Sequence, residues 1–245
     1  MHTDNFRPVV LTVAGFDPSG GAGVLADCKT FEQHSVYGLA IVSGITIQHD
    51  TGFFDVKWMP RAYIRKSMAC LAERYAVKAA KIGIQKNFSE VLFVVRELKN
   101  FWPKIKIVWD PVLSSSSGFS FVAQNNKKKL KSICREIDLI TPNAVEFEKL
   151  QIKKEEYACA LLVKGGHSGG STSTDSLFVN GKVIKHYSAP RLKNADKHGS
   201  GCVLSASLTA NLAKGELLTD SISKSKKYIS KFLTSNPTRS GYHKH

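Results

Sequence analysis

The chain has 245 residues, of which 42% are hydrophobic and 22% are charged, the composition of an ordinary globular protein. No apolar run approaches the ~20 residues that span a bilayer, and the polar stretch Met1–Arg7 lacks the apolar core of a signal peptide. We therefore expect a cytoplasmic protein without a membrane partner.

The excess of positive charge allows two interpretations. The chain holds 35 Lys and Arg against 20 Asp and Glu, for a formal net charge of +15. Such a charge is typical of nucleic-acid binding, but also of a solvated basic surface that favours anionic substrates. The basic residues are scattered over expected helix faces, as at Lys127–Lys129, and are not interleaved with aromatic residues. We therefore expect no nucleic-acid partner.

The cysteines argue against a disulfide framework and against a zinc site. They are odd in number, widely spaced and contain no C-x-x-C pair. The five are Cys28, Cys70, Cys134, Cys159 and Cys202.

Short apolar runs alternate with amphipathic segments along the chain. The first half of the chain predicts a strand at Val9–Ala14, a helix around Val24–Phe31, a strand at Tyr37–Ile47, a helix at Ala62–Ala76, a strand at Val77–Ile84, a helix with Asn87 and Glu90 in capping-box spacing and a strand at Ile105–Trp109. The second half predicts a helix at Asn126–Glu136, a strand at Ile137–Ile140, a helix capped by Asn143 and a strand at Ala158–Val163. It ends with a hairpin of Leu177–Val179 and Val183–Tyr187 around Asn180-Gly181, and with helices at Gly201–Ala213 and Leu218–Leu233. This alternation predicts an α/β fold, a three-layer α/β/α sandwich with a mostly parallel sheet, in a single domain over residues 1–245. In such sheets ligands bind at the carboxyl ends of the strands.

The first motif is the glycine-rich turn Gly15–Gly23, directly after the first predicted strand. Gly21–Ala26 formally matches a dinucleotide-binding fingerprint, but Gln48 closes the next strand where the ribose-binding acid is expected, and no Gly-Lys-Ser/Thr follows Gly20 as in a P-loop. A tight turn that opens a helix accounts for the glycines. Asp27, in the first turn of that helix, is either a partner of the helix dipole or a ligand contact.

The second motif, Asn194–Cys202, immediately precedes an apolar helix. Gly199 and Gly201 let the backbone turn its N–H groups inward at a helix N-terminus, which makes an anion site. The partial positive charge of the helix start predicts that the pKa of Cys202 falls below its ordinary value of about 8.5. Cys202 could then accept a proton from a substrate hydroxyl. The alternative is a small residue packed at a helix start.

Two acidic residues follow other strand ends. Asp110 ends the strand at Ile105–Trp109, and Glu146 stands one turn into the helix begun by Asn143. Such acids hold Mg²⁺ through one or two carboxylates together with waters and substrate phosphates. Without other motifs, however, the spacing of Asn143 and Glu146 favours a helix cap.

A basic motif, Lys164-Gly165-Gly166, follows the next strand and offers a cation and open backbone to a nucleotide. An ordinary exit from a strand is the alternative there. His167 and His198 are single histidines in glycine-rich turns, for which loop polarity is the better interpretation.

Taken together and in order, these motifs resemble the ribokinase-like superfamily and, within it, the hydroxymethylpyrimidine/phosphomethylpyrimidine kinase family. The residues that carry the resemblance are Val13–Gly15, Asp17–Gly23, Ala26–Phe31, Val36–Gly38, Gln48, Lys81–Gly83, Asp110–Val112, Ile140–Asn143, Val163–His167, Ser188–Arg191 and His198–Cys202. The resemblance implies transfer of the γ-phosphoryl group of ATP, with Mg²⁺, to 4-amino-5-hydroxymethyl-2-methylpyrimidine and then to its monophosphate, for thiamin biosynthesis. It also implies a homodimer.

The same resemblance assigns roles to the motif residues. It implies that the pyrimidine contacts Gly15, Asp27, Gln48 and Ile84. It implies an anion hole of Gly199, Ser200 and Gly201, with Cys202 as the base. It implies that Asp110 and Glu146 hold the metal, so that a metal role for Glu146 replaces the cap interpretation, and that Asn143, Lys164, Gly165 and Gly166 bind the nucleotide.

Three departures from the family pattern bear on these roles. Ser116 stands where many relatives carry a Lys that contacts phosphate, Ile84 replaces a common Met, and the tail after Leu233 is short. The competing predictions are a pyridoxal or pyridoxine kinase, against which Gln48 argues, and a non-catalytic nucleotide-binding regulator, which has no need of Cys202 with Asp110. A dinucleotide-dependent oxidoreductase is the weakest, since it lacks the ribose acid.

Overall fold

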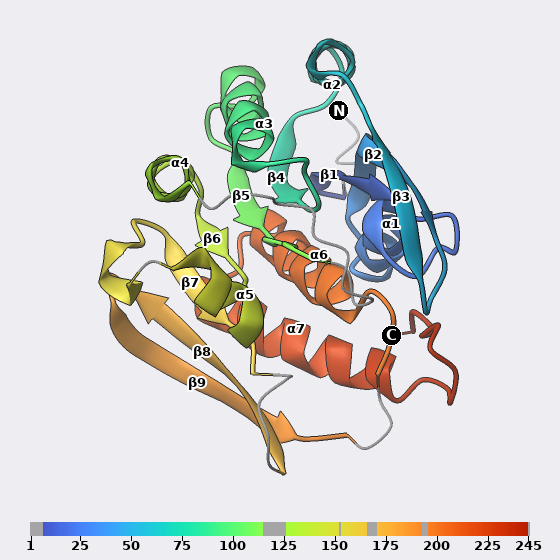
Figure 1. Cartoon of the computed structure of the whole chain (residues 1–245), viewed down its shortest axis with the longest axis vertical. Coiled ribbons are helices and arrows are strands. Elements are labelled where there is room, and N and C mark those ends of the chain that lie inside the picture. The colour runs from blue at the N-terminus through green and yellow to red at the C-terminus, as the bar shows by residue number, and fades with distance from the viewer. Residues whose placement is uncertain (1–6, 115–125, 152, 166–170, 193–195, 245) are drawn as a thin grey trace, which may run out of the picture.

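A nine-stranded sheet forms the middle layer of the computed structural model, which describes residues 7–114, 126–151, 153–165, 171–192 and 196–244 (Figure 1). The strands are β1 (Val9–Phe16), β2 (Tyr37–Gln48), β3 (Phe53–Trp58), β4 (Val77–Ile82), β5 (Lys106–Trp109), β6 (Leu139–Ile140), β7 (Ala160–Val163), β8 (Thr172–Val179) and β9 (Lys182–Pro190). Their order is β3-β2-β1-β4-β5-β6-β7-β8-β9. The run from β2 to β7 is parallel, whereas β3, β8 and β9 pair antiparallel at the two edges.

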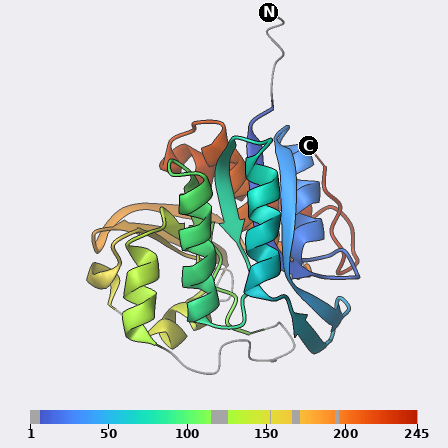
Figure 2. The same ribbon diagram turned by 90° about the horizontal axis from the view of Figure 1, so that it is seen from above.

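Helices cover both faces of the sheet, which confirms the predicted three-layer α/β/α sandwich. The helices are α1 (Gly23–Gln33), α2 (Arg61–Ala72), α3 (Phe88–Phe101), α4 (Lys127–Cys134), α5 (Ala144–Leu150), α6 (Ser200–Ala213) and α7 (Leu218–Leu233), with a short 3₁₀ turn at Lys154–Glu156. Figure 2 shows α2, α3 and α4 side by side over one face, and α1, α6 and α7 cover the other. Within the part of the chain that is described, no helix is long and apolar enough to cross a membrane.

The cores of the two faces explain why these segments fold as they do. On one side, α2, α3 and α4 bury apolar stripes that include Met68, Val94 and Ile133, all without exposed surface. On the other side, α6 is buried along nearly its whole length and packs between the sheet and α7. An apolar helix without a polar face is what a position between two layers requires.

Several predicted boundaries differ from the structure. The edge strand β3 was not predicted, and the helix predicted to reach Ala76 ends at Ala72 because Val77 already begins β4. Asn87 caps α3 by accepting from the N–H of Ser89 and Glu90, but the Glu90 carboxylate binds Arg61 of α2 and does not complete the predicted capping box. The other helix caps and turns follow the sequence more closely.

The predicted hairpin turn is confirmed in its backbone. Asn180 and Gly181 have φ values of 49° and 76°, and two positive values are what the tight turn of a two-residue hairpin needs. The hairpin joins β8 to β9 at the far edge of the sheet (Figure 1).

The parallel strands bring their carboxyl ends to one edge of the sheet. Just beyond these ends the backbone ladder continues, because Asp110 N–H donates to Ile82 O at 2.9 Å, Thr141 N–H to Trp109 O at 3.0 Å and Lys164 N–H to Pro142 O at 2.8 Å. This ladder fixes the first residues after β5, β6 and β7 beside one another. The predicted strand-end motifs therefore meet at one place.

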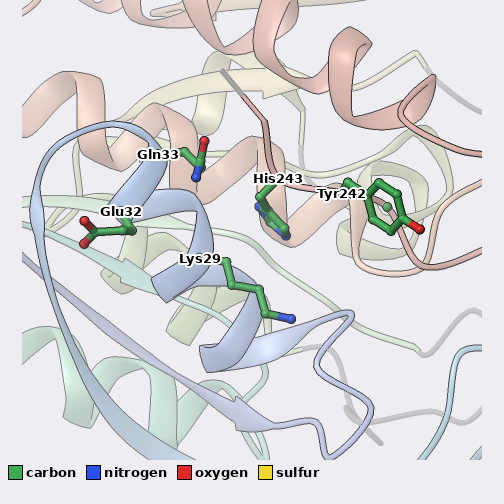
Figure 3. A pocket seen from close by; sticks show the side chains of 6 residues that line it. Lys29, Glu32, Gln33, Tyr242 and His243 are labelled. Atoms are coloured by element: carbon green, nitrogen blue, oxygen red, sulfur yellow. The ribbon is translucent and has the colours of Figure 1, made fainter.

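The chain end folds back onto α1. The His243 ring packs against Phe232, and its Nδ1 lies 3.2 Å from the Tyr228 hydroxyl and 3.4 Å from Thr30 Oγ1. Figure 3 shows His243 turned toward the helix that carries Lys29 and Gln33, in a pocket lined by Lys29, Glu32, Gln33, Gly241, Tyr242 and His243. None of these residues is among the predicted site residues. Burial, with Lys29 nearby, lowers the pKa of His243 to about 4.

We predict that His243 makes the stability depend on pH. Because its pKa is about 4 in the folded state and about 6.5 when unfolded, the unfolded chain binds more protons between these values. The stabilisation is therefore complete above about pH 6.5 and is lost as the pH falls toward 4. In wild type the free energy of unfolding should fall by about 1–2 kcal/mol more than in His243→Gln as the pH is lowered from about 6.5 to about 4. This value is reduced for partial solvent screening of His243. Urea unfolding at several pH values measures it, with the exposed His186→Gln as the control; equal pH dependence in both variants would contradict the assignment.

Candidate functional site

Two glycine-rich turns pack backbone to backbone at the carboxyl edge of the sheet. Gly199 has a φ of +74°, and a Cβ there would stand 1.9 Å from Gly21 O. Gly23 has a φ of +60°, and a Cβ there would stand 2.0 Å from Gly15 O. Because only glycine fits such a backbone conformation at such a distance, the glycines predicted from the sequence are what allows the two turns to meet.

A buried carboxylate locks the turn after β1. Asp17 has no exposed surface and accepts hydrogen bonds from Ser19 N–H at 2.9 Å and from Ala22 N–H at 2.8 Å. It also accepts from His198 Nε2 at 2.8 Å. Burial alone would raise the pKa of Asp17, but the hydrogen bonds from His198 and Ser19 outweigh it and lower the pKa. The interpretation of His198 as loop polarity is wrong, since this ring ties the two turns together.

Cys202 lies in the first turn of α6, next to the N-terminus of α1. The backbone N–H of Gly23 donates to its sulfur, and the positive charge of Lys81 acts on it. Burial nevertheless raises the pKa of Cys202. The predicted lowering of this pKa is wrong, because the burial of this half-buried thiol outweighs the effect of the helix N-terminus.

Lys81, whose charge acts on Cys202, is held in a fully buried ion pair. Lys81 and Asp27 have side chains without any exposed surface, and Lys81 Nζ lies 2.6 Å from Asp27 Oδ1. Thr12 Oγ1 donates to the other oxygen, Oδ2, at 2.6 Å. Burial alone would lower the pKa of Lys81, but Asp27, Cys202 and Asp110 raise it, so the ammonium stays charged. Both Asp27 oxygens are thus occupied by protein partners, and its predicted contact with a pyrimidine stays a prediction.

A second ion pair stands at the N-terminus of α6. Lys164 Nζ lies 2.8 Å from Asp110 Oδ1, and Thr141 and Ser205 donate to the same carboxylate at 3.1 and 3.2 Å. A Cβ placed on Gly201 would lie 3.5 Å from Lys164 Nζ and 3.7 Å from Asp110 Oδ2. We call Gly199–Gly201, at the start of α6, the anion loop. The strand ends of β5 and β7 therefore meet this loop, as the motifs predicted.

The Asn143–Glu146 pair forms the capping box that the sequence allowed. Asn143 Oδ1 accepts from Glu146 N–H and Glu146 Oε2 accepts from Asn143 N–H, each at 2.8 Å. The same carboxylate faces the ion pair, since burial and Asp110 raise the pKa of Glu146 to about 7 while Lys164 opposes the shift. Cap and site are therefore compatible roles for one residue.

These carboxylates fit a magnesium ion that arrives with phosphates. Asp110 and Glu146 supply hard oxygen donors and repel each other's charge, a repulsion that a cation relieves. Among the described residues, no group of three or more His, Cys, Asp or Glu side chains is placed to hold a metal ion. Two carboxylates with waters and substrate phosphates are the usual protein share of a Mg²⁺ site, so the donor set is sufficient.

Apolar and polar residues stand at the ends of strands β1, β2 and β4. A Cβ on Gly15 would stand 2.4 Å from Ile84 Cδ1, so that the half-buried Ile84 covers this glycine. Gln48 ends β2 and is half-buried. The structure thus brings Gly15 and Ile84 into contact and leaves the Gln48 amide partly open.

The turn after β7 is shaped for a close backbone approach. A Cβ on Gly165 would stand 2.1 Å from Thr174 O, and Gly165 N–H donates to Asp175 Oδ1 at 2.9 Å. Lys226 of α7 pairs with the other Asp175 oxygen at 2.8 Å. Gly166 and Ser116 lie outside the described residues.

Sequence reasoning did not predict three interactions at the site. They are the hydrogen bond of Asp17 with His198, the charge of Lys81 acting on Cys202, and the ion pair of Asp175 with Lys226. The signal that could have found Lys81 is a charged residue between the apolar Ala80 and Ile82 of a strand, since a buried charge needs a partner. The other two join residues that are far apart in sequence, and nothing local announces them.

A mostly parallel sheet with an anion loop at a helix start, a lysine and two carboxylates at its carboxyl edge defines a ribokinase-like phosphotransferase. Solved structures agree with this class. The chain resembles a pyridoxal kinase of Bacillus subtilis in complex with ADP, with a TM-score of 0.79 and 25% identity over 92% of this chain and 91% of the other. It resembles a phosphomethylpyrimidine kinase of Clostridium difficile with a TM-score of 0.74 and 30% identity, covering 92% and 99%.

The chain belongs to the phosphomethylpyrimidine kinase family, whose model matches residues 17–245. Curated relatives agree with this membership. It is 33% identical to the hydroxymethylpyrimidine/phosphomethylpyrimidine kinase of Aquifex aeolicus, over 92% of this chain and 94% of the relative. It is 31% identical to the protein of the same name in Staphylococcus aureus, over 94% and 89%.

We predict that Lys81→Met destabilises the fold by about 3–5 kcal/mol, because Asp27 then keeps a buried charge without its partner. Lys81→Met with Asp27→Leu should recover part of the loss, since no buried charge remains. Chemical denaturation measures both, and Lys106→Met, in an exposed ion pair with Asp138, is the control. A Lys81→Met protein within about 1 kcal/mol of wild type would contradict a charged pair.

Proposed function

We propose that this protein is an ATP-dependent kinase that phosphorylates 4-amino-5-hydroxymethyl-2-methylpyrimidine and then its monophosphate, in thiamin biosynthesis. We propose that residues 1–245 act as one kinase domain, as a homodimer in the cytoplasm. Family membership over residues 17–245 supports the reaction. ADP and AMP-PCP are present in complexes of pyridoxal kinases with this fold, which supports ATP as the phosphoryl donor.

The observation that carries the proposal is the meeting of Lys164 and Asp110 with Gly201 at the start of α6. Phosphoryl transfer requires mainly positioning and neutralisation of charge. The N–H groups of Gly199, Ser200 and Gly201 would donate to the phosphoryl oxygens at the positive end of the helix, with the Ser200 N–H exchanging its long 3.3 Å bond to Lys197 O. Lys164 would add a positive charge a few ångströms away.

The opposite side of the site would hold the pyrimidine. Gln48 can both donate and accept hydrogen bonds, as an exocyclic amino group and a ring nitrogen require. Gly15 and Ile84 would provide a flat apolar surface for the ring, since a side chain at Gly15 would collide with Ile84. Asp27 would contact the ring as well, while Lys81 and Thr12 hold its carboxylate in place.

The nucleotide side would use the carboxylates and the turn after β7. Asp110 and Glu146 would hold Mg²⁺, which when bound neutralises phosphate charge. Asn143, Lys164, Gly165 and Gly166 would contact the nucleotide. The Asp175 carboxylate supports this turn by fixing the N–H of Gly165.

Cys202 is the proposed base for the substrate hydroxyl. Lys81 and the Gly23 N–H both favour its thiolate, although burial keeps the pKa raised in the structure without substrate. Since the thiol must lose its proton before it can accept another, we expect the rate to increase with pH over the range in which Cys202 ionises. That increase should be absent in Cys202→Ala.

We predict that the purified protein consumes ATP with hydroxymethylpyrimidine and with its monophosphate, but not with pyridoxal. Cys202→Ala should lower kcat by about 10²–10⁴-fold, the usual contribution of a general base. Coupled measurement of ADP formation with each acceptor, supplied separately, tests this. Cys70→Ala, in an exposed position on α2, is the matched control and should keep wild-type activity.

The outcomes separate the alternatives. Turnover of hydroxymethylpyrimidine alone would point to Ser116, which stands where many relatives have a phosphate-binding Lys. Turnover of pyridoxal alone would favour the vitamin B6 kinase, and absence of turnover with all three would favour a nucleotide-binding regulator. Full activity of Cys202→Ala would remove Cys202 from the role of base.

A further inference from the structure

We propose that the C-terminal segment Asn236–Arg239 positions the anion loop, with Lys197 and Arg239 as positioning residues for phosphoryl transfer. The inference rests on the proposed function for its catalytic consequence. Each of the three residues before Gly199, namely Asp196, Lys197 and His198, is bound by this segment. We call residues 236–239 the clamp.

The Lys197 contact is the centre of the clamp. Its side chain is 3% exposed, and Nζ donates to Asn236 O at 2.5 Å, to Asn236 Oδ1 at 2.9 Å and to Thr238 O. Among the described residues, no carboxylate lies within salt-bridge distance of this ammonium. A buried cation is tolerated only when its donors are satisfied, and here three carbonyl oxygens satisfy them. The position of Lys197 is therefore set by the path of the clamp backbone.

Arg239 connects the clamp to both sides of the site. Its carbonyl oxygen accepts from His198 N–H at 2.9 Å, and its NH1 lies 3.0 Å from Asp196 Oδ2. Its Nε donates to Asp50 O at 3.1 Å. Asp50 lies two residues after Gln48, so Arg239 joins the turn beyond the proposed pyrimidine contact to the loop that would receive the phosphate.

The clamp is itself rigidly held. Asn236 Oδ1 accepts from Thr238 N–H and Oγ1, each at 2.8 Å, and Asn236 Nδ2 donates to Ser240 O at 2.9 Å. Beyond it, Tyr242 N–H donates to Ser235 Oγ at 2.8 Å, and His243 packs on Phe232 at the end of α7. A segment fixed at both ends can transmit the position of α7 to the loop.

The anion loop needs such support because of its composition. Gly199 and Gly201 give its backbone more freedom than any other residue type would, and ordering that backbone costs free energy. An anion hole is effective only when its N–H groups are already oriented before charge develops. A displacement of about 1 Å can cost about a hundredfold in rate. The clamp should therefore affect kcat more than ATP binding.

We test this with Lys197→Met and Arg239→Met in the full-length protein. Lys197→Met keeps the length of the side chain and removes the ammonium, and Arg239→Met removes both guanidinium contacts. We expect kcat to fall about 10- to 100-fold in each, with KM for ATP within about twofold of wild type. Hydrogen exchange at residues 198–202 should become at least about tenfold faster.

Matched variants separate positioning from general damage. Lys224→Met and Arg61→Met remove exposed ion pairs with Glu216 and Glu90, and should leave kcat unchanged. Asp196→Asn should lower kcat less than Arg239→Met does, because it weakens only the Asp196–Arg239 contact. Adding it to Arg239→Met should have little further effect, since Arg239→Met already removes that contact. Arg239 is 38% exposed in its side chain, so its variant should fold even if Lys197→Met does not.

Two results would overturn the inference. One is wild-type kcat in folded Arg239→Met, and the other is unchanged hydrogen exchange at residues 198–202 in that variant. If wild type turns over none of the three acceptors, the proposed function fails. Hydrogen exchange then still decides whether the clamp orders the loop.

Discussion

The site depends on the close approach of two glycine turns. Gly199 packs on Gly21 with no space for a side chain, which brings the N-termini of α1 and α6 close together, and Gly23 packs on Gly15 within the first turn. This approach places the Gly23 N–H against Cys202. The bond between Asp17 and His198 then fixes the two turns with respect to each other. One constraint on side-chain size thus brings the anion loop and the Cys202 thiol together.

One fully buried and one partly buried ion pair lie near these turns and fix the local electric field. Lys81 pairs with Asp27, and Lys164 pairs with Asp110. Buried pairs are weak evidence for stability, because desolvation offsets their attraction, so orientation is the better account of their presence. Threonine hydroxyls donate to both carboxylates and hold them in place. The lysines are consequently fixed charges, and a phosphate bound there as proposed would not incur the cost of ordering a flexible side chain.

The sequence predicted those parts of the structure that are encoded locally. Strands and helices follow from apolar periodicity, and the strand-end motifs follow from the rule that parallel strands meet at one edge. Residues 181 positions apart join in the pair of Asp17 and His198, so no local pattern reveals it. The pKa of Cys202 was predicted wrongly because helix position is visible in a sequence, whereas burial is not. The edge strand β3 was missed because one side of it is unpaired and its residues are largely exposed, which removes the apolar signal.

Four of the lysines have structural roles around the carboxyl edge of the sheet. Lys81, Lys164, Lys197 and Lys226 are turned inward, where they meet carboxylates or carbonyl oxygens around the carboxyl edge of the sheet. Lys226 of α7 supports the turn at Gly165 through Asp175, and the segment after α7 binds Lys197. Helix α7 and the segment that follows it therefore contact residues that support both the proposed nucleotide turn and the anion loop. Because Gly165 and the anion loop share this support, the proposed positions of the donor phosphate and the acceptor hydroxyl would depend on α7 as well as on the strands.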